Sequence, residues 1–305
     1  MGLYVLGLDG GGTKTLAQAT DETGADLFRV GGGALNPNSE TPDRVRATVR
    51  EILDEAVRTA GAQPAAVCVA AAGVSNPDAR RLLEQAVRDA GFEGTLHVTG
   101  DHMAALAGAL GRPEGMILIA GTGSICAGQT ADGRTARAGG RGHLIDDEGS
   151  GYAMGRDVLR AVVEAEDGRG PATCLTERVY RELGAENLGD VVSFVYAPER
   201  TKRDIAALAK FLPEAAAEKD EAALAIYDRA GRELARLAAA VAKQLELSEG
   251  KLALAGSALR NDEQLRRCLN AHLAQLAPGI VTVLPRQDAA FGAALLARQL
   301  LKGAV

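Results

Sequence analysis

Short apolar runs alternate along the first part of the chain with longer segments in which apolar residues recur at helical spacing. Strands are predicted at 3–9, 14–20 and 25–30, a helix at 42–60, a buried strand at 65–71, a helix at 77–90, a short strand at 96–99 and a helix at 101–110. Pro42 and Gly61 are typical start and stop signals of the first helix. This alternation favours an α/β architecture in which helices cover the sheets.

The second half of the chain opens in the same order. Strands are predicted at 116–120, 124–130 and 134–138, followed by a helix near 150–165. Residues 173–248 are then rich in helix-forming residues at helical spacing, with a break at Pro213 and a long helix over 220–246. A strand at 251–255, a helix at 261–276, a strand at 280–284 and a helix at 288–301 complete the pattern. We interpret this as a weak internal duplication with a helical insertion at about 173–248.

Composition and charge favour a soluble globular protein without a nucleic-acid or membrane partner. The 305 residues are 47% hydrophobic and 24% charged, as in soluble globular proteins, and the net charge of −6 disfavours a nucleic-acid partner. No apolar run approaches the roughly 18 residues of a membrane helix, and no leader peptide is recognisable, so a cytoplasmic location without a membrane partner is expected. Four cysteines, at 68, 126, 174 and 268, fit neither a zinc site nor a redox pair. We interpret them as small buried apolar residues, with ligation of a cofactor by a subset as the alternative.

Two glycine-rich segments follow apolar runs, one in each half of the chain. Each is predicted to form the tip of a β-hairpin, where backbone N–H groups and a hydroxyl make a concave anion site. Two such tips suggest two loops that hold one polyphosphate. The candidate phosphate-binding residues are Gly11, Gly12, Thr13 and Lys14 in the first segment and Gly121, Thr122, Gly123 and Ser124 in the second.

Two carboxylates stand at predicted strand ends in the first half. Asp9 precedes the first glycine-rich tip, where it could hold Mg²⁺ directly or through water; a turn residue bonded to its own loop is the alternative. Asp101 follows a strand end and starts a helix, so it is either an N-cap or a general base that accepts the proton of an attacking hydroxyl.

The densest polar stretch, Gly139 to Gly151, combines glycines, a histidine and three adjacent acids. It is predicted to press against a polyhydroxy ligand, because carboxylates accept sugar hydroxyl groups well; a solvated helix cap is the alternative. Asn36 is either a turn residue or an amide that binds ligand hydroxyls. The small residues Gly256, Ser257 and Ala258 at a late strand end would let a nucleobase or ribose lie against the backbone.

Taken in this order, the motifs resemble the sugar-kinase/Hsp70/actin superfamily. Within it they are similar to the group that contains N-acetylglucosamine kinase, glucosamine kinase and the BadF/BcrA-type ATPases, and the resemblance covers essentially the whole chain. It implies two actin-like (ribonuclease H-like) domains with ATP in a cleft between them, domain closure on the ligands, and a homodimer. The expected boundaries are 1–112, joined by the C-terminal helix 288–305, and 113–287.

The resemblance also assigns roles to residues. Asp101 becomes the catalytic base, the two glycine-rich tips become the phosphate loops, and the segment at Gly256 becomes the adenosine contact. The positions that match sugar-binding residues of these kinases are Asn36, Asp101, Thr122, Gly140, Gly142, His143, Asp147 and Glu148. Arg141 stands where kinases similar to the animal enzyme carry a Trp, and it could reach an acidic group such as the lactyl carboxylate of N-acetylmuramic acid.

The function predicted is therefore ATP-dependent phosphorylation of N-acetylglucosamine at its 6-hydroxyl, with Mg²⁺ and ATP. Glucosamine and N-acetylmuramic acid are the alternative substrates. Two other classes stay open. One is an activator ATPase with a [4Fe–4S] cluster between subunits, for which Cys126 and Cys174 are the candidate ligands. The other is a sugar-binding regulator without transferase activity.

Overall fold

The computed structural model describes residues 2–74, 76–301 and 303, and it divides into two compact units. The first unit comprises the described part of 1–117, 128–134 and 285–305, and the second comprises 118–127 and 135–284. Residues 285–305 thus belong to the same unit as residues 1–117. Residues 302, 304 and 305 of the helix predicted over 288–305 lie outside the described residues, and the domain boundary at 112 stays a prediction.

The first sheet has five strands in the order β3-β2-β1-β4-β5. Its strands are β1 (Tyr4–Gly10), β2 (Thr15–Asp21), β3 (Asp26–Gly32), β4 (Ala66–Ala71) and β5 (Thr95–Gly100). β1 is antiparallel to β2 and parallel to β4, which is in turn parallel to β5. All five strands were predicted from the sequence, with ends displaced by a residue or two.

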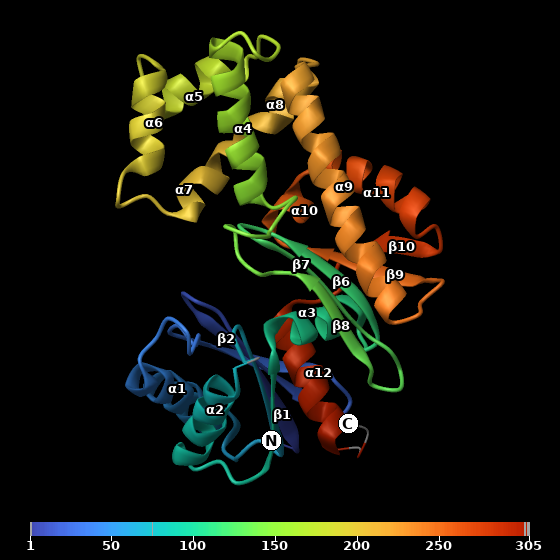
Figure 1. Cartoon of the computed structure of the whole chain (residues 1–305). Helices are drawn as coiled ribbons and strands as arrows, with labels where there is room; N and C mark the ends of the chain where they lie inside the picture. Colours follow the sequence, from blue (N-terminus) through green and yellow to red (C-terminus); the bar gives the residue numbers. More distant parts are fainter. Residues whose placement is uncertain (1, 75, 302, 304–305) are drawn as a thin grey trace. The chain divides into compact units, whose positions relative to one another are not determined.

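Helices cover both faces of this sheet, with α1 (Pro42–Ala60) and α2 (Pro77–Asp89) on one side and α3 (Asp101–Leu110) and α12 (Ala289–Leu301) on the other (Figure 1). Because side chains alternate along a strand, Leu6 and Leu8 belong to the core under α1, whereas Val5 packs with α3 and α12. Each fully buried Leu or Val side chain of this kind contributes about 1.5–3 kcal/mol. A Cβ on Gly7 would lie 1.9 Å from the amide nitrogen of Ala294, so β1 and α12 are in backbone contact.

The second sheet repeats the arrangement of the first. Its strands are β6 (Gly115–Ala120), β7 (Ser124–Gln129), β8 (Thr135–Gly139), β9 (Gly250–Ala255) and β10 (Ile280–Val283), in the order β10-β9-β6-β7-β8. When the strands are numbered from one within each half of the chain, both sheets have the strand order 3-2-1-4-5, the second sheet being read from β8 to β10. This shared order supports the internal duplication inferred from the sequence.

Helices fill the chain between β8 and β9. They are α4 (Gly151–Glu166), α5 (Leu175–Leu183), α6 (Leu188–Tyr196), α7 (Lys202–Ala206), the 3₁₀ helix η1 (Ala207–Phe211), α8 (Leu212–Ala217) and α9 (Glu221–Gln244). The long helix predicted over 220–246 is confirmed as α9, and Pro213 lies in the first turn of α8. That these helices are an insertion stays an interpretation.

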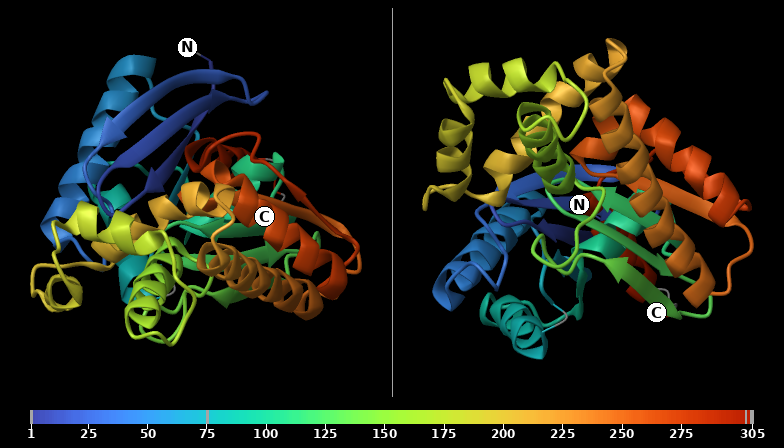
Figure 2. Two further views of the ribbon diagram at one scale, coloured as in Figure 1. Left: turned by 90° about the horizontal axis from the view of Figure 1, so that it is seen from above. Right: turned by 45° about the horizontal axis from the view of Figure 1, so that its top comes forward.

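The last helices of the second unit follow β9. They are α10 (Ser257–Asn261), which was not predicted, and α11 (Glu263–Leu276). In both views of Figure 2, α11 runs beside α9. Among the described residues, no helix is both long enough and apolar enough to cross a membrane.

Candidate functional site

The first predicted phosphate loop is the tip of the β1–β2 hairpin, as expected. Gly10 pairs with Thr15, and the amide of Gly11 donates to the carbonyl of Lys14 at 3.0 Å, which closes the turn. A Cβ on Gly11 would lie 2.9 Å from that carbonyl oxygen, so a larger residue is excluded. Gly12, Thr13 and Lys14 are exposed. The tip therefore presents its backbone and the Lys14 ammonium to solvent, as a phosphate site requires.

Strand register brings the first-unit carboxylates to one edge of the sheet. Asp9 pairs with Ala70 of β4, Ala70 pairs with Thr99 of β5, and Asp101 follows two residues later. Burial raises the pKa of Asp9 to about 6, and the charges of Asp101 and Asp288 add to that rise. The sequence interpretation missed Asp288, whose signal was its place at the start of the last helix, where its carboxylate accepts from the amide of Phe291 at 3.0 Å.

Asp101 keeps one carboxylate oxygen available. Its Oδ1 accepts from the amide of His102 at 2.9 Å and lies 3.4 Å from His102 Nδ1, and no described residue donates to Oδ2. The side chain is 49% exposed. Burial pushes the pKa of Asp101 up, but the hydrogen bonds and charge of His102 outweigh burial and hold the pKa below its usual value of 3.8. The group is thus a charged acceptor at neutral pH.

Asp9 can take part in Mg²⁺ binding only together with other ligands. Within the described residues, no group of three or more His, Cys, Asp or Glu side chains could hold a metal ion. Mg²⁺ commonly uses one or two carboxylates, several waters and substrate phosphates. A single carboxylate beside the exposed tip of the β1–β2 hairpin fits that pattern, in which waters and phosphate oxygens would supply the remaining ligands.

The second predicted phosphate loop joins β6 to β7 and is held by the start of α4. The carbonyl of Gly121 accepts from the amide of Gly151 at 2.8 Å, and the carbonyl of Thr122 accepts from the amide of Tyr152 at 3.3 Å. Ser124 is buried, and its hydroxyl donates to the carbonyl of Glu148 at 2.8 Å. The loop is therefore fixed by neighbouring backbone rather than free to move independently.

The acidic stretch before α4 folds back beneath this loop. Asp147 is only 4% exposed and has a φ of 65°, in the left-handed region that Asp tolerates better than most residues. A Cβ on Gly123 would lie 2.8 Å from Asp147 Oδ2, so the glycine permits this contact. Glu148 is held by Arg156, whose Nη2 lies 3.0 Å from both carboxylate oxygens. The structure thus gives both predicted sugar ligands protein partners; their role in sugar binding stays a prediction.

The other predicted sugar-binding residues lie in turns. Asn36 Oδ1 accepts from the amide of Asn38 at 3.0 Å, which is the turn bond that the sequence left as an alternative. The ring of His143 meets Tyr152 edge-on, with ring centroids 4.7 Å apart. Gly140 and Gly142 have φ values of 70° and 97°, so the tight loop around His143 depends on glycine. Their contact with a sugar stays a prediction.

A cavity of about 430 Å³ in the second unit unites two motifs that are far apart in sequence. Gly121 and Thr122 of the phosphate loop line it together with Ser257 and Ala258, the predicted adenosine contact. Gly256 supports this junction: its φ is 85°, and a Cβ there would lie 2.2 Å from the carbonyl oxygen of Ala120. The polar lining of the cavity also includes residues that the sequence interpretation missed: Arg203, Lys210, Asn261 and Asp262.

The cysteines do not suit a cluster ligand set. Cys126 is 0% exposed, and burial raises the pKa of its thiol far above the usual value. Cys174 also has a raised pKa, at about 11, because of burial and the nearby Asp220 carboxylate. A cluster that bridges two subunits needs cysteines at the protein surface, so the full burial of Cys126 argues against the [4Fe–4S] alternative.

Comparison with known proteins places these features in a family context. The model of the BadF/BadG/BcrA/BcrD ATPase family matches residues 6–297. The N-acetylmuramic acid/N-acetylglucosamine kinase of Clostridium acetobutylicum is 33% identical over 304 residues, which span 97% of this chain and 98% of the relative. The N-acetyl-D-glucosamine kinase of Dictyostelium discoideum is 30% identical over 312 residues, 96% of this chain and 97% of the relative.

Solved structures agree on the fold. A Chromobacterium violaceum protein assigned as an N-acetylglucosamine kinase superposes with a TM-score of 0.75 at 29% identity, covering 97% of this chain and 99% of that one. The ROK hexokinase of Thermus thermophilus gives a TM-score of 0.59 at 19% identity, covering 99% and 100%. The predicted α/β fold class of actin-like sugar kinases is thereby confirmed.

Proposed function

Because the chain belongs to the BadF/BadG/BcrA/BcrD ATPase family, we propose that it is an ATP-dependent amino-sugar kinase that phosphorylates N-acetylglucosamine at its 6-hydroxyl. The observation that carries the proposal is the cavity in which Gly121 and Thr122 meet Ser257 and Ala258. Its volume of about 430 Å³ lies within the range of roughly 300–1,000 Å³ that is typical of small-molecule sites. A nucleoside placed against Ser257 would direct its phosphates toward the Gly121 loop.

The proposed chemistry assigns a task to each group. The sugar hydroxyl transfers its proton to Oδ2 of Asp101. At the same time the hydroxyl oxygen bonds to the γ-phosphorus of ATP, and the bond between that phosphorus and ADP breaks. The exposed Lys14 ammonium and the backbone of the two loops bind the phosphate oxygens. Asp9 would hold Mg²⁺, which neutralises phosphate charge when it is bound. Because the pKa of Asp101 is lowered, it is ready to accept a hydrogen bond at neutral pH.

The substrate is proposed within the amino sugars that the relatives' names specify, N-acetylglucosamine and N-acetylmuramic acid. Arg141 supports acceptance of the acidic sugar. It is exposed, and its backbone amide donates to Asp146 Oδ2 at 3.0 Å, which fixes the position of its main chain. A guanidinium there is suited to the lactyl carboxylate of N-acetylmuramic acid. A homodimer in the cytoplasm belongs to the same proposal and rests on the resemblance to the family.

Release of ADP tests the proposal directly. The protein is assayed with Mg²⁺ and ATP against N-acetylglucosamine, N-acetylmuramic acid, glucosamine, glucose and no sugar. We expect ADP release that depends on an N-acetylated hexosamine, and a loss of about 10²–10⁴ in kcat for Asp101→Asn. Asp54→Asn, an exposed change on α1, is the matched control and should leave kcat unchanged. ADP release that ignores every sugar would overturn the kinase proposal, and full activity of Asp101→Asn would remove the base.

A further inference from the structure

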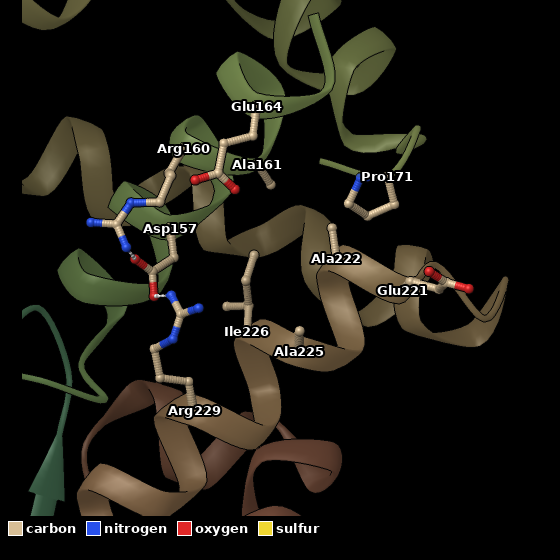
Figure 3. Close-up of a pocket in the computed structure, with 10 residues that line it drawn as sticks. All are labelled: Asp157, Arg160, Ala161, Glu164, Pro171, Glu221, Ala222, Ala225, Ile226 and Arg229. Carbon is tan, nitrogen blue, oxygen red and sulfur yellow. Dashed lines mark hydrogen bonds and ion pairs between the residues drawn. The ribbon is translucent and has the colours of Figure 1, made fainter. Parts of the chain in front are cut away.

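A second cavity, of about 270 Å³, lies between α4 and α9 in the second unit (Figure 3). It shares no lining residue with the cavity at Gly121. Ala161 of α4 and Ala222 of α9 contribute small apolar side chains to its lining. Charged side chains stand at its ends: Figure 3 shows Asp157, Arg160 and Arg229 gathered at one end and Glu221 at the other.

One carboxylate oxygen of Asp157, a residue that lines this cavity, accepts no hydrogen bond within the described part of the chain. Its side chain is only 5% exposed. Its Oδ2 accepts from Nη1 of Arg229 at 2.9 Å, whereas Oδ1 receives no hydrogen bond from any described residue. An unsatisfied buried oxygen of this kind is costly and is expected to find a donor. A ligand hydroxyl that enters the cavity can be that donor.

The same end of the cavity carries two guanidiniums, those of Arg160 and Arg229, beside the Asp157 carboxylate. Three guanidiniums surround the Asp157 carboxylate, since Arg156 and Arg160 each lie 3.7 Å from its Oδ1 and Arg229 bonds to its Oδ2. Arg156 is also paired with Glu148. Arg160 and Arg229 therefore share one carboxylate, and their side chains are 53% and 42% exposed. Their remaining N–H groups are suited to a phosphate, which guanidiniums bind through paired hydrogen bonds.

The far end has the opposite charge. Glu221 of α9 lines it, and no described basic residue is paired with Glu221. Carboxylates accept hydrogen bonds from sugar hydroxyls and from ammonium groups. The cavity is smaller than the roughly 300–1,000 Å³ of most ligand sites, which suits a monosaccharide derivative better than a nucleotide.

We propose that the cavity between α4 and α9 is a binding site for a hexosamine phosphate. The phosphate is bound by Arg160 and Arg229, a ring hydroxyl donates to Asp157 Oδ1, and the amino group faces Glu221 at the far end. The site is separate from the proposed catalytic function, because binding here needs neither ATP nor turnover. The ligand nonetheless contacts α4, the helix whose first amides hold Gly121 and Thr122.

Hydrogen–deuterium exchange of the full chain tests the site. The probes are glucosamine 6-phosphate, inorganic phosphate and glucosamine, each added without nucleotide. We expect glucosamine 6-phosphate alone to slow amide exchange in the second half of α4 and the first half of α9. Slowing confined to peptides that contain residues 121–124 or 257–258 would report only the proposed catalytic site and would overturn this proposal.

Two variants test separately the charge of the phosphate ligands and the volume of the cavity. Arg229→Gln removes one phosphate ligand, and Ala222→Leu fills the cavity without changing its charge; each should abolish the slowed exchange. Arg236→Gln on the same helix is the control, because Arg236 is paired with Glu233 away from the cavity. If Arg229→Gln does not fold, the amide exchange of Ala222→Leu alone tests the proposal. Protection that survives Ala222→Leu, or that inorganic phosphate or glucosamine reproduces equally, contradicts the assignment.

Discussion

The backbone amide of Ser124 donates to Oδ1 of Asp147 at 3.3 Å, so a residue at the start of β7 is bonded to a carboxylate 23 positions further along the chain. The bond is buried, and it holds the turn before α4 against the loop Gly121–Gly123. The predicted phosphate loop and the predicted sugar loop of the second unit are therefore one connected structure. A change in either loop is expected to affect both ligands.

Replacement of Asp147 by alanine should destabilise the protein. The change leaves the buried Ser124 amide without an acceptor, which costs about 1–3 kcal/mol, and alanine tolerates the left-handed φ of 65° poorly. Asp147→Asn keeps both an acceptor oxygen and tolerance of that φ, so it should lose less. Urea unfolding measures the difference. Equal stability of the two variants would show that the hydrogen bond does not hold the loop.

Gly256 should not tolerate even a methyl group. An alanine Cβ at this position meets the Ala120 carbonyl at 2.2 Å, at a φ of 85°. Gly61→Ala is the matched control, because Gly61 has a φ of 75° but nothing within 4 Å of the added Cβ. The control measures left-handed strain alone, about 1–2 kcal/mol. We expect Gly256→Ala to lose clearly more unfolding free energy and to raise the KM for ATP, whereas Gly61→Ala leaves the KM unchanged.

Asp220 should stabilise the second unit in a pH-dependent way. Its carboxylate accepts from the amides of Ala223 and Cys174 and from the Thr173 hydroxyl. Burial pushes the pKa of Asp220 up, but these hydrogen bonds outweigh it and lower the pKa below 3.8. The lowered pKa means that the stabilisation is complete above the unfolded value near 3.8 and is lost as the pH falls through the folded value.

Asp220→Ala should therefore cost about 1 kcal/mol at pH 7, the usual contribution of a helix N-cap, and less at pH 3. Chemical denaturation at both pH values measures the two differences. Asp54→Ala, which removes an exposed carboxylate within α1, is the control. A larger loss at pH 3 than at pH 7 would contradict the assigned direction of the pKa shift.

Arg203 should bind nucleotide although no sequence motif marks it. It lines the cavity at Gly121, and no described acidic residue pairs with it. Arg203→Gln is expected to raise the KM for ATP roughly three- to tenfold, about 0.7–1.4 kcal/mol. A charge-assisted hydrogen bond contributes about 1.5–3 kcal/mol, and solvent screening in an open site reduces that contribution. Lys202→Gln, one residue away and outside the cavity, serves as the control. Identical KM values in the two variants would place Arg203 outside the nucleotide site.

Local signals in the sequence predicted most of the framework. Apolar runs with glycine-rich ends placed the β1–β2 tip, and Pro42 with Gly61 bounded α1, whose N-cap is Thr41. These features depend on a few neighbouring residues, so one sequence is sufficient to predict them.

Other features depend on contacts between distant segments. The pairing of Glu148 with Arg156 needs the conformation of a glycine-rich turn, and the place of Arg203 in a cavity needs the packing of α7. The short helix α10 has too few residues for an apolar period to be detected. The division of 175–217 into short helices is set by caps such as Asn187 and Thr201, which the sequence contains but does not rank above continuous helix.

The last helix of the chain has a consequence for the order of events during protein synthesis. One face of the first sheet, with Val5, Ala66 and Cys68, is covered by α12 as well as by α3. Until the ribosome has translated residues 289–301, that face stays partly bare, although most folding domains are completed in the order of synthesis. The first unit therefore closes only after residues 135–284 of the second unit have been translated, and a nascent chain that is released before then would present an apolar sheet to chaperones.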